Sequence, residues 1–407
     1  MSKVIVGFIL GLLVSVGTLA VFADNHGESD VRVSARKLTD GRVEVAVQQR
    51  HGDSWSERQL PDSRFLPADA EPGRWRVSSA VSILGPEAET TLAPDAKDLY
   101  CLVTHARPGD EAFWAFFEAG ATRWNVYRDD ISVVVKHGPT GAEQAALIRE
   151  CIDQGAAAIG SSLADPEALR EALLEADAAG IPVVTFNSGL LDFVSVNSRR
   201  HISVDETAAG ATAGALLIEA GVEGRVLCVI HEARNIGLVE RCEGLEDGYD
   251  RGEIERLYVT GVGDLAATTE ELVDRLNSMV APPIAAILSL NTEIGLVSLN
   301  AIDATGSQAQ AATFDHTAEV LRAIADGRML FAMNTSPFHQ AYIALTYMHW
   351  VDATEPRFRQ LFNIENTLPV IGQLPILIGP RVFTAENAAA WLKIQAGAQA
   401  TANIEVE

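Results

Sequence analysis

The feature that most constrains this fold is a regular alternation of strand-like and helix-like segments that begins near Tyr100. Short runs rich in β-branched residues, such as Ile131–Lys136, are each followed by a segment with apolar residues at helical spacing. This alternation produces parallel sheets covered by helices on both faces. Because roughly nine such units exceed one comfortable sheet, we expect two doubly wound α/β lobes, with an eight-fold barrel as the alternative.

Local signals set the expected boundaries of these elements. Thr140 and Glu143 form a capping box, and Asp165-Pro166 starts a second helix, which Gly180 ends. We expect strands at 131–136, 157–159, 181–186, 202–204, 226–230, 256–259, 284–290, 311–314 and 330–333, and helices at 207–220, 238–250, 267–280, 293–304, 317–326, 337–350 and 385–396.

The first part of the chain follows a different pattern. Lys3 precedes an uncharged run that ends at residue 23, with small residues placed for cleavage before Asp24, so residues 1–23 are predicted to be an export signal. The run is also long enough for an uncleaved membrane anchor. Residues 30–84 alternate in the manner of β-strands and predict a small β-rich module, and the polar residues 85–98 predict a linker.

Four cysteines in an exported chain allow two disulfides. Cys228 lies in the expected strand 226–230 and Cys242 lies in the helix after it, which favours a local bridge. Cys101 and Cys151 fall within one α/β block and could form the second. The alternative is four buried thiols. No Cys or His spacing indicates a metal site.

Charge and motifs exclude several functions. A net charge of −24 argues against nucleic acid and anionic membrane surfaces, because both need basic patches. The glycine turn at 261–266 fits a dinucleotide fingerprint only loosely, and His231-Glu232 lacks the second histidine of a zinc protease helix. Ser161 lacks the glycine context of a nucleophile elbow. We therefore expect no enzyme and no cofactor.

The stretch from Leu99 to Trp124 predicts a strand, a turn and a helix rich in aromatic residues. The apolar positions of that helix recur at helical spacing and suit packing on a sheet. Trp114 lies off this stripe, near the helix start, where such a unit opens toward a ligand crevice. Phe113 and Trp114 are therefore predicted to face a ligand, with burial of both in the core as the alternative.

In open α/β sheets, ligands bind beyond the carboxyl ends of the strands. That rule selects a set rich in amides, hydroxyls and imidazoles, which suits a neutral, polyhydroxylated ligand whose apolar face packs on aromatic rings. Asp315 could instead cap a helix, the asparagines could stabilise turns, and Arg241 is expected to form a salt bridge on its own helix. The predicted ligand-binding residues are Phe113, Trp114, Asn187, Asn291, Asp315, His231, Asn334, Thr104 and His105.

Residues 99 to about 385 resemble the type I periplasmic binding proteins, which include the ribose- and galactose-binding proteins of ABC transporters. The order and spacing of the matching pieces carry this resemblance. These pieces are PGDEAFW (108–114), QAALIRECIDQGAAAIGSSLADPEAL (144–169), AGIPVVTFNSG (179–189), ISVDETAAGATAGALL (202–217), NIGLVERCEGLEDGY (235–249), ILSLNTEIGLVSL (287–299) and TFDHTAEVLRAIADG (313–327).

The resemblance implies two lobes joined by three crossovers, near Asp205, near Asn334 and after Leu368. Lobe 1 would comprise 99–204 plus about 336–372, and lobe 2 would comprise 205–335 plus the C-terminal segment. It also implies contacts of the sugar with the aromatic pair, Asn291 and Asp315. Ribose binders carry an Asp-Arg pair where this chain has Asn187-Ser188, a Gln at Thr335 and an Arg at Val239. These differences imply a pocket with less charge than a ribose site.

The expected function is therefore that of a periplasmic or extracellular solute-binding protein, a monomer that captures a small neutral sugar or polyol for an ABC permease. The resemblance implies that the lobes close over the ligand. A membrane-tethered sensor ectodomain with the same cleft is the first alternative. A repressor of the lactose-repressor type would need a basic helix-turn-helix, and residues 1–98 offer β-strand patterns instead.

Overall fold

The computed structural model describes residues 19–22, 31–37, 43–51, 54–57, 65–66, 97–126, 128–278, 281–362 and 374–394, with side chains described from residue 97 onward except at 354–362. The chain forms two compact units, residues 1–90 and 91–407. The predicted export signal lies outside the described residues except for 19–22, and the predicted linker lies outside them up to residue 96. Both stay predictions.

The first unit contains an antiparallel sheet. Strand β2 (Val31–Lys37) lies between β1 (Leu19–Phe22) and β3 (Val43–His51), and β3 also pairs with β4 (Ser54–Glu57) and β5 (Phe65–Leu66). Val33 of β2 lies opposite Val47 of β3. The alternating residues of this region therefore form the β-rich structure that their pattern predicts.

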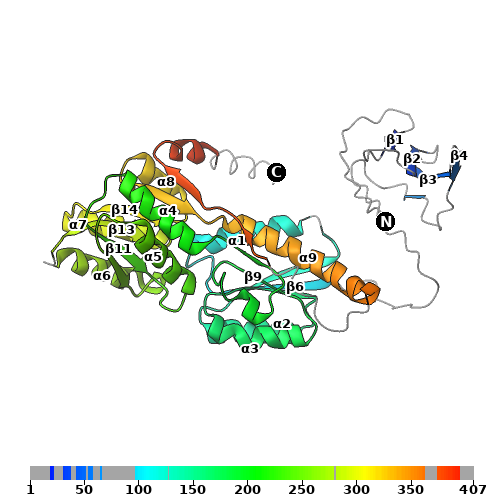
Figure 1. Cartoon of the computed structure of the whole chain (residues 1–407), viewed down its shortest axis with the longest axis horizontal. Coiled ribbons are helices and arrows are strands. Elements are labelled where there is room, and N and C mark those ends of the chain that lie inside the picture. The colour runs from blue at the N-terminus through cyan, green and yellow to red at the C-terminus, as the bar shows by residue number, and fades with distance from the viewer. Residues whose placement is uncertain are drawn as a thin grey trace. The chain divides into compact units, whose positions relative to one another are not determined.

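The second unit begins with a six-stranded parallel sheet, which forms lobe 1 (Figure 1). Helices α1 and α9 pack on one face of this sheet, and α2 and α3 pack on the other. In sheet order, its strands are β16 (Ile376–Leu377), β10 (His201–Ser203), β9 (Val183–Phe186), β8 (Ala158–Ser162), β6 (Asp98–Thr104) and β7 (Ile131–His137), and its helices are α1 (Ala112–Asn125), α2 (Gly141–Asp153), α3 (Pro166–Ala178) and α9 (Pro337–Phe362).

Lobe 2 repeats this architecture around a second six-stranded sheet, whose edge strand β17 runs antiparallel. Helices α4 and α5 pack on one face, and α6, α7 and α8 contribute to the clusters on the other. In sheet order, its strands are β12 (Ile254–Tyr258), β11 (Arg225–Ile230), β13 (Ile284–Ser289), β14 (Gln310–Phe314), β15 (Phe331–Asn334) and β17 (Arg381–Thr384), and its helices are α4 (Glu206–Glu219), α5 (Ile236–Gly248), α6 (Leu265–Asn277), α7 (Thr292–Thr305) and α8 (Ala318–Ala325).

Three crossovers connect the lobes: from β10 to α4, from β15 to α9 and from β16 to β17. The first two lie at the predicted positions, Asp205 and Asn334. The third lies later than the predicted lobe 1 boundary at about 372, because Ile376 and Leu377 still pair with β10. Two doubly wound sheets are thus observed, and the barrel alternative is wrong.

Local signals in the sequence explain most element boundaries. Thr140 and Glu143 form the complete capping box, and Asp165 caps α3 with Pro166 in its first turn. Helix α9 continues to Phe362, beyond the predicted residue 350, and buried Leu345, Met348 and Val351 carry its apolar spacing onward.

Helices α4 and α5 touch backbone to backbone. A Cβ added at Gly244 would lie 1.9 Å from the carbonyl oxygen of Thr207, and one at Gly210 would lie 2.0 Å from that of Arg241. A Cβ added at Gly248 would lie 2.2 Å from the carbonyl oxygen of Ala211. Glycine at these three positions is what allows the two helices to approach so closely.

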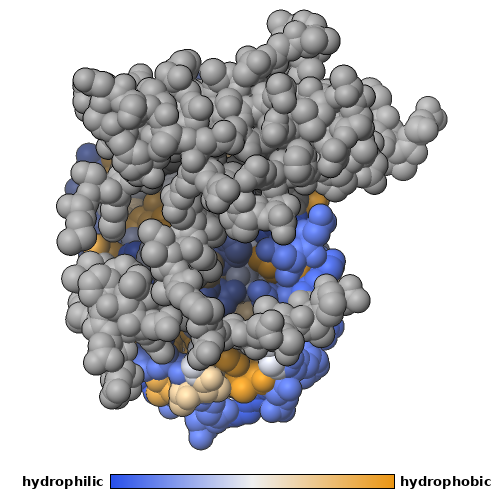
Figure 2. All heavy atoms as spheres, turned by 90° about the vertical axis from the view of Figure 1, so that its right-hand side faces the viewer, coloured by the Kyte–Doolittle hydropathy of each residue, from blue (hydrophilic) through white to orange (hydrophobic). Residues whose placement is uncertain are grey.

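On the face drawn in Figure 2, the coloured residues are largely hydrophilic, with small hydrophobic areas between them. Scattered apolar residues of this kind are normal on a surface that faces water. Among the described helices, none combines the length and the apolar character needed to cross a bilayer.

Candidate functional site

A pocket lies between the carboxyl ends of the strands of the two sheets, where the strand-end rule places it. About 310 Å³ of space free of protein atoms, part of it open to solvent, lies between the residues that line it. The residues that line it come from both lobes: His105, Glu111, Phe113, Trp114, Asn187, Ser188, His231, Glu232, Asn235, Leu238, Arg241, Leu290, Asn291 and Asp315.

The start of helix α1 forms an aromatic wall. Phe113 and Trp114 both line the pocket and are only 6% and 1% exposed. Their rings meet edge to face with centroids 4.8 Å apart, and Trp114 makes the same kind of contact with His105. Phe117 packs behind Trp114. These contacts fix the orientation of both rings before any ligand binds.

Asn187 and Asn291 follow strands β9 and β13. Asn187 adopts a left-handed backbone conformation, with φ of 67°, which turns the chain beside the pocket. Asn291 caps α7, where its Oδ1 accepts a hydrogen bond of 2.8 Å from the Ile294 amide. Asn291 therefore stabilises a turn and lines the pocket at the same time, so the two predicted roles coexist.

Asp315 lies at the carboxyl end of β14 and does not cap the next helix. Thr317 is the N-cap of α8. The Oδ1 atom of Asp315 accepts hydrogen bonds from the amide and the hydroxyl of Thr335, at 3.2 and 2.7 Å. Burial raises the pKa of Asp315, although the nearby Arg241 opposes this shift. Thr335, which stands where ribose binders carry Gln, thus orients this carboxyl group.

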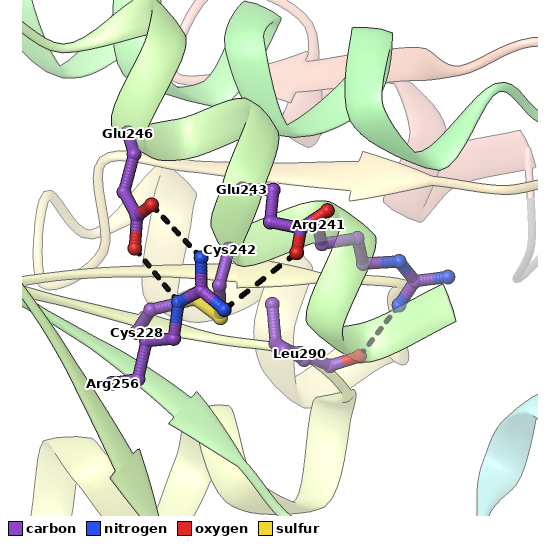
Figure 3. The surroundings of a disulfide bond; sticks show 7 residues. All are labelled: Cys228, Arg241, Cys242, Glu243, Glu246, Arg256 and Leu290. Atoms are coloured by element: carbon purple, nitrogen blue, oxygen red, sulfur yellow. Dashed lines mark hydrogen bonds and ion pairs between the residues drawn. A yellow bond between two sulfur atoms is a disulfide. The ribbon is translucent and has the colours of Figure 1, made fainter. Parts of the chain in front are cut away.

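Arg241 is the buried cation of the site, and the prediction of a salt bridge on its own helix is wrong. Its partner is Glu206 at the start of α4, which accepts hydrogen bonds of 2.6 and 3.0 Å from the guanidinium. Arg241 also donates to the carbonyl oxygen of Leu290 at 2.9 Å, as Figure 3 shows. The sequence could not reveal this pair because the partners lie 35 residues apart.

The two disulfides join Cys101 to Cys151 and Cys228 to Cys242. Both predicted pairings are therefore observed, and the alternative of four free thiols is wrong. Cys242 directly follows Arg241, so the bond to β11 anchors α5 next to the buried cation (Figure 3). Arg256 of β12 adds a forked ion pair with Glu246 on the same helix, at 2.7 and 2.8 Å.

Sequence reasoning missed two carboxylates, which face each other from opposite lobes. Glu111 precedes α1, and Glu232 follows β11 beside His231. One ligand atom from each of these three residues lies within 4.8 Å of the others. A search for acids next to the predicted aromatic and histidine residues would have found both. The pocket therefore contains two acids that the predicted set of ligand-binding residues lacks.

Burial shifts the pKa values of the acids and histidines around Glu111 and Glu232 toward the uncharged forms, and neighbouring groups add to or oppose these shifts. Burial raises the pKa of Glu111 well above its ordinary value, and the charges of Glu232 and Glu293 raise it further. Burial lowers the pKa of His231 to about 4 and also lowers that of His105. Burial opposes ionisation of Glu232, but the facing imidazoles and Asn235 outweigh it, so its pKa is lowered. At neutral pH the histidines are neutral and Glu232 is ionised.

Seven of the nine predicted residues line the pocket, and Thr104 and Asn334 do not. The hydroxyl of Thr104 is buried and bonds to the Ala106 carbonyl oxygen at 2.9 Å and to His137 Nδ1 at 2.7 Å. Asn334 Oδ1 accepts from the Ser336 amide at 2.8 Å. Both side chains stabilise the backbone around their strand ends, and both are the last residues of their strands. The pocket is lined by residues that come after the strand ends.

The lobes contact each other around the pocket. The Ala112 amide donates to Glu293 Oε1 at 2.9 Å, and the Ile236 amide donates to the Ala164 carbonyl oxygen at 3.0 Å. The rings of Phe116 and His316 stack with centroids 5.6 Å apart. Each contact joins a lobe 1 residue to a lobe 2 residue, so the structure represents a closed arrangement.

A family model described as a periplasmic binding protein domain matches residues 103–351. A carbohydrate transporter from Acidothermus cellulolyticus 11B, solved with myo-inositol, is similar at 26% identity and a TM-score of 0.65, over 74% of this chain and 98% of that one. AraP, an arabinose binding protein from Geobacillus stearothermophilus, is similar in fold at 20% identity and a TM-score of 0.55, over 72% of this chain and 99% of that one. A solute binding protein from Bacillus halodurans C-125, solved with bound myo-inositol, is similar in fold. Its sequence identity is 15% and its TM-score is 0.61, over 74% of this chain and 99% of that one.

No curated protein matches this chain.

Proposed function

The chain belongs to the periplasmic binding protein domain family, and from that premise we propose that it is an exported protein that captures a sugar or polyol for an ABC importer. The family comprises solute-binding proteins of the periplasm or the extracellular space rather than enzymes. Its type I fold has two doubly wound lobes, as described above. The proposal concerns the ligand and the transport role of this particular chain.

The pocket between the two lobes is the observation that carries the proposal. Lobe 1 supplies two buried aromatic rings, and lobe 2 supplies carboxylate, guanidinium and amide groups. Aromatic rings cover the apolar C–H face of a sugar ring, while charged and amide groups bind its hydroxyls. The myo-inositol bound to the Acidothermus relative supports a cyclic polyol as the ligand.

Closure of the lobes would couple binding to transport. Because groups from both lobes line the pocket, a ligand that contacts them all stabilises the closed form. A micromolar affinity corresponds to about −8 kcal/mol. A few hydrogen bonds to charged groups, at roughly 1.5–3 kcal/mol each, together with ring burial can supply this after ordering costs. A permease would then recognise the closed form.

A thermal-shift screen against monosaccharides, inositols and nucleosides tests the proposal, because a ligand raises the apparent stability of the protein that binds it. For the best polyol, we expect Asp315→Ala to weaken binding more than about tenfold, or at least 1.4 kcal/mol, in titration calorimetry. The matched control is Asp303→Ala, which removes an exposed carboxylate paired with Arg328 in the same lobe. Equal affinities for both variants, or no stabilising sugar or polyol, would contradict the proposal.

A further inference from the structure

Acids outnumber bases among the described residues that line the pocket. Three carboxylates face it, from Glu111, Glu232 and Asp315, whereas Arg241 is its one permanently charged base. Glu206 already holds that guanidinium through two hydrogen bonds and neutralises it. The two lining histidines are neutral at pH 7, because burial lowers the pKa of each. Burial raises the pKa of Glu111 and of Asp315, whereas the pKa of Glu232 is lowered, so Glu232 is the acid that keeps its negative charge most readily, and no lining side chain balances that charge.

The three acids differ in how well they are satisfied. Asp315 accepts two hydrogen bonds from Thr335, and Glu232 accepts one of 2.7 Å from Asn235. Glu111 is only 6% exposed, yet its Oε1 atom has no hydrogen-bond donor among the described residues. A buried carboxylate oxygen without a donor is costly, so this atom marks the place where a donor from a ligand would gain most.

The surroundings of Glu111 Oε1 indicate which kind of ligand group would donate a hydrogen bond to it. It lies 4.0 Å from His231 Nε2, and the Glu232 carboxylate belongs to the same compact group. A hydroxyl group donates one hydrogen bond and brings no charge. A primary ammonium group has three donors and a positive charge, so it can donate to both facing carboxyl groups and balance the charge of Glu232. The rings of Phe113 and Trp114 nearby also favour a cation.

We infer that the pocket selects a polyol that carries a protonated primary amine, an amino sugar or an aminocyclitol, with its ammonium group between Glu111 and Glu232. The polyol ring would pack on the aromatic wall, and its hydroxyls would bind Asn187, Asn291 and Asp315. This inference rests on the proposed function, because it specifies the ligand class of the same pocket.

Titration calorimetry of the purified chain in the presence of EDTA tests the inference, since the chelator keeps divalent ions away from the carboxylates. The probes are matched pairs that differ in one group: glucosamine and glucose, galactosamine and galactose, and an inosamine and myo-inositol. N-Acetylglucosamine serves as the uncharged amide. We expect the amine to bind at least tenfold more tightly than the alcohol in at least one pair, and acetylation to abolish this gain.

Two variants locate the effect. Glu232→Gln keeps the shape of the side chain and removes its charge, and we expect it to reduce the preference for the amine to less than about threefold. Glu111→Gln is the second variant, for use if the first fails to fold. Glu150→Gln removes an exposed acid paired with Lys136 and should leave the preference unchanged.

The outcomes separate this inference from the proposed function. Neutral polyols that bind as tightly as their amines would overturn the inference and leave the proposed function intact. A preference for the amine that survives in both Glu232→Gln and Glu111→Gln would also overturn it. Failure of every sugar and polyol to bind, aminated or not, would overturn both.

Discussion

Helices α1 and α5 occupy equivalent places in the two lobes, since each follows the first strand of its lobe and begins beside the pocket. Helix α1 is held by apolar packing of large rings, including Phe117 and Trp124, which are fully buried. Helix α5 is held by a disulfide, by glycine contacts with α4 and by a forked ion pair. The helix that carries the buried Arg241 is thus the one attached by a covalent bond.

The difference shows how one fold unit serves two purposes. Ring packing on α1 leaves apolar faces at the pocket, which suits contact with a sugar ring. A buried guanidinium on α5 needs a fixed partner, because an uncompensated charge in the interior costs several kcal/mol. The attachment of α5 keeps Arg241 in register with Glu206 across the two helices.

Among the variants that test this difference between α1 and α5, Arg241→Leu is expected to have the largest effect on stability. The substitution leaves Glu206 buried without its cation, and we expect the free energy of unfolding to fall by about 3–5 kcal/mol. Denaturant titration measures the change. Arg149→Leu, which removes an exposed ion pair with Glu175, is the control and should cost less than about 1 kcal/mol. A stable Arg241→Leu variant would show that α5 does not depend on the buried pair.

Removal of the disulfides, one at a time, sharpens the comparison. The bonds span sequence separations of 50 and 14 residues, so loop entropy predicts losses of about 4 kcal/mol for Cys101→Ala/Cys151→Ala and about 3 kcal/mol for Cys228→Ala/Cys242→Ala. Only the second bond adjoins Arg241. We therefore expect only the second variant to weaken binding of the best polyol, measured by calorimetry at a temperature where both variants are folded. Equal affinities would contradict the link between this bond and the site.

The smallest expected effect on stability comes from the titration of His201, a buried histidine of lobe 1 that lies outside the pocket. Burial lowers the pKa of His201 to about 3, so the folded protein binds fewer protons than the unfolded chain between that pH and about 6.5. Its contribution to stability is therefore complete above pH 6.5 and is lost as the pH falls. Between pH 7 and pH 5 we expect a loss of about 2 kcal/mol from this group.

The His201→Gln variant isolates that contribution. Its unfolding free energy should fall less between pH 7 and pH 5 than that of the parent chain, by the same amount. His231 has a pKa of about 4 and acts in the same direction, so the parent retains some pH dependence in either case. An unchanged pH dependence in the variant would show that His201 is not buried in its neutral form.

The fold was predictable because its signals are local. Capping residues, glycine ends and strand patterns each lie within a few residues of the element they define, and the disulfide between Cys228 and Cys242 also follows from short spacing. The lining of the pocket was predictable where a residue directly follows a strand, as for Asn187 and Asp315. This rule does not indicate whether a side chain turns inward, and Thr104 and Asn334 are predicted residues that do not line the pocket.

Long-range pairing explains the other errors. Arg241 meets Glu206 across two helices, and Glu111 meets Glu232 across two lobes. No spacing in one sequence reports such contacts, since they depend on how the lobes close. The two acids lie next to predicted residues in the sequence, but their approach to each other across the lobes became visible only in three dimensions.

The glycine contacts between α4 and α5 have a consequence for how recognition in this protein can be redesigned. Even the smallest side chain at Gly210, Gly244 or Gly248 would collide with main-chain atoms of the opposite helix, so neither helix can be rotated or spaced apart by simple mutation. Altered specificity then has to come from the loops at the strand ends. An engineer would keep this helix pair as a fixed frame and randomise only the residues that follow β9, β11, β13 and β14.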